Sequence, residues 1–363
     1  MLFRSAANLT AKNITLEYSS ALRSADQPYD SQLHVLDGGS VSISEANIRI
    51  AHGLPFRIDA GGHMSIAGTG FGWGGSATKV LTGKMYVDGT LDITAPLDGY
   101  KEMQFIGSGR VDLKGGADAS KDTRDIVLIG HKDGLTCGIL DWHSAVGANI
   151  VRLVAENQVR LVALADGTYG PAAGETSGST ALERAFLIRD FATLEVHTTD
   201  PDAAEPVART LTFVDPIVGG GALVKKGAGT LVLASGENAV TGGVTIAEGT
   251  LAWTAEQEIP GPLTAQAGTT LKFGMANGAV LPLACGGNVT LAGATLEPYD
   301  ATARAAIRAG GEASWQTILT VSEGTKIVSL PTVDDCFRLR VTETTDGNAL
   351  QISRIPGTRV FLR

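Results

Sequence analysis

This chain of 363 residues contains few cysteines. Its three cysteines, Cys137, Cys285 and Cys336, lie far apart in the sequence, and no Cys/His spacing typical of a metal site occurs. We therefore expect no metal and no cofactor. The thiols are expected to be buried and free, or to include one incidental pair.

Basic clusters and long apolar runs are also missing. The net charge is −9, and no basic run is longer than Lys225–Lys226. Phosphate contacts require clustered lysine and arginine, so we expect no nucleic-acid partner. A stretch of about 18 apolar residues would be needed for a membrane-spanning helix, and none is present. An acidic surface is also a poor match for anionic membranes.

The start of the chain lacks an export signal. Residues Met1 to Thr10 have neither the charged beginning nor the apolar run of about 7 to 15 residues that marks a signal peptide. Only about 50 residues follow Ser314. We therefore expect a fragment whose signal was lost, with export through another protein as the alternative.

Glycine, in contrast, is abundant, and it follows a pattern. The chain holds 46 glycines, nearly twice the average usage of about 7%. Between residues 219 and 251, short alternating strands are separated by glycine and asparagine corners, and Gly-Thr-Leu recurs at 229–231 and 249–251. A period of about 20 to 25 residues indicates a solenoid, in which each coil buries its apolar side against its neighbours.

This segment resembles the passenger-associated transport repeat, also called the autotransporter-associated β-strand repeat, of secreted bacterial surface proteins. The matching positions are Lys225, Gly227, Gly229, Thr230, Leu231, Leu233, Gly236, Asn238, Gly242, Gly243, Gly249, Thr250 and Leu251. Val240 departs from the pattern, because the repeat usually carries an aromatic residue there. The resemblance implies a solenoid architecture and the export class of secreted bacterial surface proteins. We expect these residues, Asn238 among them, to be structural.

The same spacing extends along the chain. The first inward residue after each glycine corner is expected at Val41, Met64, Leu91 and Val111, and later at Leu231, Leu251, Leu271 and Leu296. The sequence therefore predicts an all-β protein, a right-handed parallel β-helix over residues 1–300. Residues 120–215 are expected to form irregular coils, with residues 182–191 as a short helix or a strand.

The C-terminal part has a different character. Residues 301–309 are rich in alanine and end at Gly310–Gly311, which predicts a helix. The longer strands that follow are joined by turn residues such as 345–348, which is typical of antiparallel hairpins. Residues 301–363 are therefore expected to be a helix and an antiparallel cap that blocks the edge of the last coil.

Few residues suggest a catalytic or binding site. Residues 121–125 combine carboxylates and cations. Such a cluster could be a calcium site or an acid/base site of a β-helix carbohydrate enzyme, or a solvated turn with a local ion pair. Asp141 and His143 would share one face of a strand, with Trp142 on the other. This trio is either a sugar-binding or catalytic patch, or an ordinary surface.

The other candidates are weaker still. Asp334–Asp335 is an acidic pair in a turn, and His52, His63 and His131 lack the spacing of ligands. The glycine-rich run at 219–229 is not followed by the residues or the helix of a phosphate-binding loop. We assign no catalytic residue and no metal ligand.

The sequence thus favours a non-enzymatic passenger or stalk segment, secreted or displayed on a bacterial surface, that supports transport, presentation or adhesion. The expected partners are an outer-membrane export machinery and surface glycans or host surfaces. The alternative is a β-helix polysaccharide lyase or glycoside hydrolase. A lectin-like module is a third hypothesis. It would need a row of exposed aromatic residues, for which the candidates are Phe71, Trp73 and Trp142.

Overall fold

The structure is a computed structural model. It describes residues 2–3, 8–12, 33–44, 47–51, 56–68, 70–74, 83–97, 102–116, 124–143, 145–146, 149–171, 180–309, 314–334, 336–345 and 347–355. The chain forms two compact units, residues 1–195 and 196–363. The boundary expected between residues 300 and 301 divides the chain at another place and stays a prediction.

The described residues of the first unit form strands and one short helix. Its elements are β1 (Leu2–Phe3), β2 (Asn8–Lys12), β3 (Leu33–Val35), β4 (Ser40–Ser44), β5 (Asn47–Ala51), β6 (Phe56–Ile58), β7 (His63–Ile66), β8 (Gly70–Gly74), β9 (Gly83–Val87), β10 (Thr90–Ile93), β11 (Met103–Gly107), β12 (Arg110–Leu113), β13 (Arg124–Ile139), β14 (Trp142–His143), β15 (Ala145–Val146), β16 (Asn149–Ala163), β17 (Gly167–Gly170), α1 (Ala181–Arg184), β18 (Phe186–Ile188) and β19 (Thr193–His197), which crosses the boundary.

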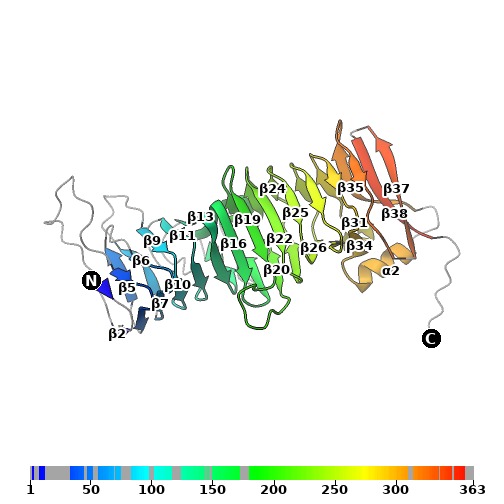
Figure 1. The fold of residues 1–363 in the computed structure, drawn as a ribbon. Helices are drawn as coiled ribbons and strands as arrows, with labels where there is room; N and C mark the ends of the chain where they lie inside the picture. Colours follow the sequence, from blue (N-terminus) through cyan, green and yellow to red (C-terminus); the bar gives the residue numbers. More distant parts are fainter. Residues whose placement is uncertain are drawn as a thin grey trace. The chain divides into compact units, whose positions relative to one another are not determined.

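These strands stack as the coils of a parallel β-helix (Figure 1). One stack contains β4, β7, β10 and β12, all parallel and in register. A second contains β3, β6, β9, β11 and the first half of β13. Each coil therefore hydrogen-bonds through its backbone to the next, which satisfies groups that would otherwise be buried without partners.

The inward residues expected from the sequence form the core of this unit. Val41, Met64, Leu91 and Val111 are register partners in successive coils. Each is at most 1% exposed. The spacing of the sequence thus fixes the register, because a shift by one residue would turn every one of these side chains outward.

The middle of the chain contains the longest strands. β13 and β16 pair in parallel over most of their length, with one irregularity between Gly130 and Leu135. Residues 182–191, expected as a helix or a strand, contain the end of α1 and all of β18. These coils therefore retain the parallel stacking. In β13, one long strand pairs with both β11 and β12, which are separate strands in the preceding coil.

The second unit continues the same type of architecture and adds a longer helix. Its elements are β20 (Thr210–Phe213), β21 (Ile217–Gly219), β22 (Ala222–Lys226), β23 (Thr230–Leu233), β24 (Ala239–Val240), β25 (Val244–Ile246), β26 (Thr250–Trp253), β27 (Gln257–Ile259), β28 (Leu263–Ala265), β29 (Thr270–Phe273), β30 (Met275–Ala276), β31 (Ala279–Val280), β32 (Leu283–Cys285), β33 (Val289–Thr290), β34 (Thr295–Pro298), α2 (Ala301–Ala309), β35 (Gln316–Ser322), β36 (Ile327–Ser329), β37 (Phe337–Thr344) and β38 (Gly347–Arg354).

Three parallel stacks enclose the core of this unit. The first is β22–β25–β28–β33–β36, the second is β20–β23–β26–β29–β34, and the third is β27–β32–β35. In the second stack the expected inward residues Leu231, Leu251, Leu271 and Leu296 are register partners. All four are at most 2% exposed. A threonine precedes each of them and forms an outer ladder in the same register.

The end of the unit is antiparallel, as the sequence predicts. β38 pairs antiparallel with β35 on one side and with β37 on the other. Because β35 also pairs in parallel with β32, the antiparallel strands occupy the edge that a further coil would otherwise use.

The described residues include no helix long and apolar enough to cross a membrane. All three cysteines are free thiols, and Cys137 and Cys285 are buried. Burial raises the pKa of the Cys285 thiol to about 12. This thiol therefore stays protonated and is a weak nucleophile at neutral pH.

Candidate functional site

Lys225 has the most unusual environment in the 219–251 segment. It is the last but one residue of β22, and its side chain is fully buried. Its Nζ donates to the carbonyl oxygens of Lys226 at 2.9 Å, Gly227 at 2.6 Å and Glu248 at 2.9 Å. Burial lowers the pKa of Lys225 to about 8, and the charge of Glu248 opposes that shift in part. The ammonium group therefore closes one turn and joins it to the next coil.

Asn238 joins coils in a second place. Its side-chain oxygen accepts from the backbone N–H of Ile217 at 2.7 Å, and its amide donates to Gln257 Oε1 at 2.6 Å and to the Ser235 carbonyl at 2.8 Å. Gln257 in turn donates to the same Ser235 carbonyl at 2.6 Å. Both amides are buried, so this network satisfies backbone groups inside the coil.

Glycine is required where corners of successive coils approach each other. A Cβ atom on Gly229 would lie 2.0 Å from the Arg209 carbonyl oxygen. At Gly249 φ is +69°, and a Cβ there would lie 2.3 Å from the Gly227 carbonyl oxygen. Any side chain at these positions would push neighbouring coils apart.

The remaining repeat positions lie in or beside these strands. Thr230, Leu231 and Leu233 belong to β23, Thr250 and Leu251 to β26, and Gly242 and Gly243 lie between β24 and β25. Val240, at the position where the repeat usually has an aromatic residue, is 2% exposed. A smaller apolar side chain thus occupies this interior position.

The acidic candidates that the structure describes, Asp125 and Asp141, have different partners. Asp125 forms an ion pair with Arg152, with distances of 2.5 Å to Nε and 3.1 Å to Nη2. Lys121 and Asp122 lie outside the described residues. Asp141 instead accepts a hydrogen bond from the Thr168 backbone at 2.8 Å. Each carboxylate therefore has a local structural partner from the following coil.

Trp142 does not fit the lectin-like reading. It is fully buried, and its indole donates to the Val151 carbonyl at 3.0 Å. The sequence reading of this residue as an exposed aromatic was wrong, because the side chain points into the coil opposite to Asp141. Phe71 and Trp73 lie in β8, outside the residues whose side chains are described.

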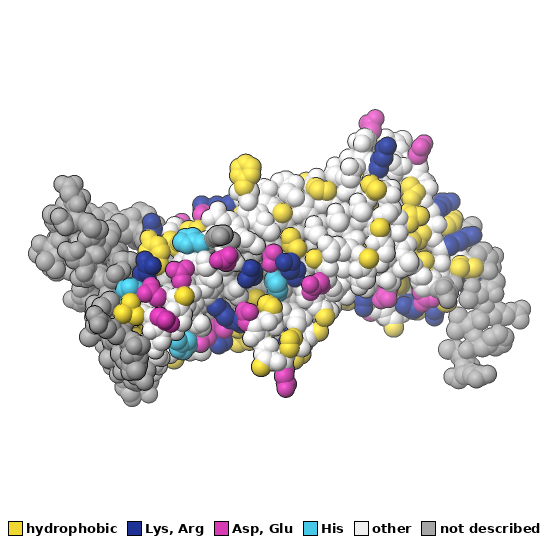
Figure 2. Space-filling view, in the orientation of Figure 1, with side chains coloured by type: hydrophobic (Ala, Val, Ile, Leu, Met, Phe, Trp, Pro, Cys, Tyr) yellow, Lys and Arg dark blue, Asp and Glu magenta, His cyan; other side chains and the backbone are white. Residues whose placement is uncertain are grey.

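Other charged side chains on the first unit pair with each other. His63 Nε2 lies 3.0 Å from Asp92 Oδ2, and Lys114 donates to the other oxygen of Asp92 at 2.6 Å. Burial opposes ionisation of Asp92, but these hydrogen bonds outweigh it and lower the pKa of Asp92. Figure 2 shows acidic, basic and histidine side chains interspersed on this part of the surface, as such pairing requires.

The last two candidate groups have no ligand-like arrangement. Asp334 accepts from the Cys336 backbone at 3.0 Å and pairs with Arg304; the first of these contacts is the main cause of its lowered pKa. His131 is exposed, while Asp335 and His52 lie outside the described residues. Within the described part of the chain, no group of three or more His, Cys, Asp and Glu side chains is placed to hold a metal ion.

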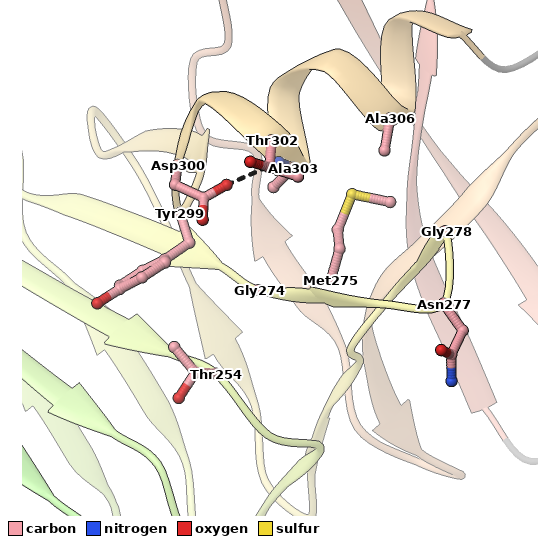
Figure 3. Close-up of a pocket in the computed structure, with 10 residues that line it drawn as sticks. All are labelled: Thr254, Gly274, Met275, Asn277, Gly278, Tyr299, Asp300, Thr302, Ala303 and Ala306. Carbon is pink, nitrogen blue, oxygen red and sulfur yellow. Dashed lines mark hydrogen bonds between the residues drawn. The ribbon is translucent and has the colours of Figure 1, made fainter.

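A groove of about 360 Å³ lies in the second unit, between the β30–β31 hairpin and α2 (Figure 3). Its lining residues are Thr254, Gly274, Met275, Asn277, Gly278, Tyr299, Asp300, Thr302, Ala303 and Ala306. Met275 extends from the hairpin toward the helix, and Tyr299 and Thr254 lie at one end (Figure 3). Asp300 precedes α2 and accepts from the backbone N–H of Ala303 at 2.7 Å.

This groove was not expected from the sequence. A two-residue turn, Asn277–Gly278, connects β30 and β31, and this pair is a strong hairpin signal. Both residues have positive φ, 52° and 79°. The hairpin could thus have been predicted, but its closeness to α2 depends on how the coils stack.

The comparisons with known proteins agree with the architecture. Residues 223–252 match the family model described as passenger-associated-transport-repeat. Over 135 residues the chain is 36% identical to "Adhesin BmaC autotransporter" of Brucella suis biovar 1 (strain 1330). The match covers 33% of this chain and 4% of that relative, so the chain spans a small part of its length. No solved structure matches the chain.

The repeat match covers the segment in which Lys225 and Asn238 join successive coils, and it begins and ends within β22 and β26. The chain is therefore a parallel β-helical protein that carries a passenger-associated transport repeat.

Proposed function

We propose that this chain is a non-enzymatic passenger segment displayed on a bacterial surface or released from it. The single observation that carries the proposal is the transport repeat at 223–252, folded as an interior part of a stacked β-helix. The similarity to a protein named as an autotransporter adhesin supports a role in adhesion or presentation. The acidic net charge is compatible with a soluble extracellular surface.

In this proposal the repeat residues are structural. Lys225 and Asn238 satisfy buried carbonyl and N–H groups, the leucines fill the core, and the glycines permit close corners. The residues concerned are Lys225, Gly227, Gly229, Thr230, Leu231, Leu233, Asn238, Gly242, Gly243, Gly249, Thr250 and Leu251.

The repeat also provides a physical route for assistance in transport. Each coil of a solenoid is stabilised mainly by its neighbours, so folding propagates from a nucleus. Coils that stack outside the outer membrane would oppose backward movement of the chain through the export machinery. The hydrogen bonds of Lys225 and Asn238 to the next coils favour such a nucleus at 219–251.

Deletion of residues 219–251 from the complete exported protein tests this role. We expect less protein on the cell surface and more precursor in the periplasm, measured with an epitope tag placed in an exposed turn. The double variant Lys225→Met with Gly229→Ala should have the same effect without shortening the chain. The matched control is Glu237→Ala, because this side chain is exposed within the same repeat. Unchanged surface display of the deletion variant would contradict the role in transport.

A carbohydrate-active β-helix enzyme is the alternative, for which a groove with converging carboxylates would be the distinguishing feature. Asp125 and Asp141 have separate partners, Arg152 and the Thr168 backbone. Of the described residues that line the groove beside α2, one is a carboxylate, Asp300. Polysaccharide cleavage by the purified chain, lost in Asp125→Asn or Asp141→Asn, would favour the enzyme over the passenger segment.

A further inference from the structure

The groove beside α2 is formed where the repeat is interrupted. In the second stack, Thr210, Thr230, Thr250 and Thr270 are register partners at steps of 20 residues, but the next partner is Thr295. The longer step contains the β30–β31 hairpin, and α2 follows directly after β34. Insertions into a regular solenoid often form its binding face. Both insertions line the same groove.

The hairpin wall of the groove is held firmly. The Leu281 N–H donates to the Gly274 carbonyl at 3.0 Å, which closes the base of the hairpin. The indole of the buried Trp253 donates to the Leu281 carbonyl at 2.8 Å, and Gln316 Oε1 accepts from the Val280 N–H at 2.8 Å. Such anchoring preorganises a wall and reduces the entropy lost on binding.

The helical wall is anchored as well. Asp300 caps the first turn of α2, and Ala303 and Ile307 are buried. Arg304 pairs with Asp334, and Arg354 donates to the Arg308 carbonyl at 3.2 Å. The two walls therefore keep their separation without a ligand between them.

The lining combines an aromatic ring, a carboxylate and hydroxyl groups. Tyr299 is half-buried, while Asp300, Thr254 and Thr302 are exposed. Met275 and the alanines of α2 supply apolar surface beside them (Figure 3). Among the described residues that line the groove there is no lysine or arginine.

This chemistry selects among ligand classes. Among the described lining residues, an anionic ligand would meet Asp300 without a compensating cation, and a metal ion would find a single carboxylate. A purely apolar ligand would desolvate the carboxylate and hydroxyl groups without replacing their hydrogen bonds. A sugar ring offers hydroxyl groups to the carboxylate and threonines, and an apolar C–H face to Tyr299. The volume of about 360 Å³ lies within the range of small-ligand sites, about 300 to 1,000 Å³.

We propose that this groove binds a neutral glycan, with Asp300 and Thr302 as hydrogen-bonding residues and Tyr299 as the stacking residue. The proposal rests on the proposed role in surface adhesion and names its partner. Binding by the purified chain requires no export, so its failure can be told apart from a failure of the proposed function.

Two alanines of α2 provide a matched test. Ala306 lines the groove, whereas Ala305 is exposed and does not line it. The probe is an array of neutral oligosaccharides with terminal glucose, galactose, mannose or N-acetylhexosamine, alongside sialylated and sulfated counterparts, followed by titration of the neutral oligosaccharide that gives the highest array signal. Ala306→Phe should weaken binding of that oligosaccharide at least tenfold, and Ala305→Phe should leave it unchanged.

Asp300→Asn supplies a second variant that is expected to fold, because asparagine also caps helices well. We expect it to weaken binding of the same oligosaccharide severalfold while the melting temperature stays within a few degrees. Absence of binding across the neutral array, a preference for the acidic glycans, or equal affinity of the Ala306→Phe and Ala305→Phe variants would each overturn the proposal.

Discussion

The ammonium group of Lys225 donates a hydrogen bond of 2.9 Å to the carbonyl oxygen of Glu248, 23 residues further along the chain. The carboxylate of Glu248 returns the contact by accepting from the Gly227 N–H at 2.8 Å. The two residues therefore connect consecutive coils through charge-assisted hydrogen bonds in both directions. Such bonds are stronger than neutral ones and suit a place where coils must stack in one register.

Replacement of Lys225 by methionine is expected to lower the free energy of unfolding by about 1–3 kcal/mol, because three carbonyl oxygens each lose a charged donor. Lys226→Met is the matched control, since the side chain of Lys226 is next in the sequence and only partly buried. Urea unfolding monitored by circular dichroism measures both. Equal midpoints for the two variants would contradict the role assigned to Lys225.

The stability conferred by Lys225 should depend on pH. Burial lowers its pKa to about 8 from the ordinary value of 10.5, so between these values the unfolded chain binds more protons than the folded one. Stability relative to Lys225→Met should therefore rise from pH 8 to pH 10, by at most about 1.4 kcal/mol per pH unit. Urea titrations of both proteins across this range provide the measurement. A constant difference would show that Lys225 is protonated throughout.

Asn238→Ala is expected to cost about 1–3 kcal/mol, since it removes the acceptor of the buried Ile217 N–H and a donor to Gln257. If the two amides act together, Asn238→Ala and Gln257→Ala should be non-additive in a double-mutant cycle. Glu237→Ala, at the exposed neighbouring position, is the control. Additive losses would mean that the two amides stabilise the coils independently.

Gly229→Ala should destabilise the repeat more than Gly236→Ala. The new methyl group would lie 2.0 Å from the Arg209 carbonyl at position 229, but 3.1 Å from its nearest neighbour, the Glu256 carbonyl, at position 236. The first variant must separate the coils, whereas the second requires a shift of a few tenths of an ångström. Melting temperatures of the two purified variants distinguish these cases, and a larger drop for the second would refute the account of the corner.

Much of the fold follows from periodicity. Glycine corners and the alternating apolar residues predicted both ladders of inward side chains, from Val41 to Val111 and from Leu231 to Leu296. The antiparallel end could be predicted as well, because longer strands and a turn signal replace the repeat there. These features depend on local sequence and on contact with the next coil.

The site could not be predicted in the same way. Trp142 is apolar and aromatic whether it faces a ligand or the core, and only the direction of its strand decides that it is buried. Tyr299 and Met275 share a groove because two insertions, in consecutive coils, lie over the same part of the second unit. Their proximity results from coil stacking, which the spacing of neither insertion reveals alone.

Protease shaving of intact cells tests the central claim most directly. Cells that produce the complete protein are treated briefly with trypsin, and the released peptides are identified by mass spectrometry together with a cytoplasmic marker. The account predicts peptides from both halves of this chain in the supernatant while the marker stays inside the cells. Peptides that appear only after lysis would contradict surface display and with it the proposed passenger function.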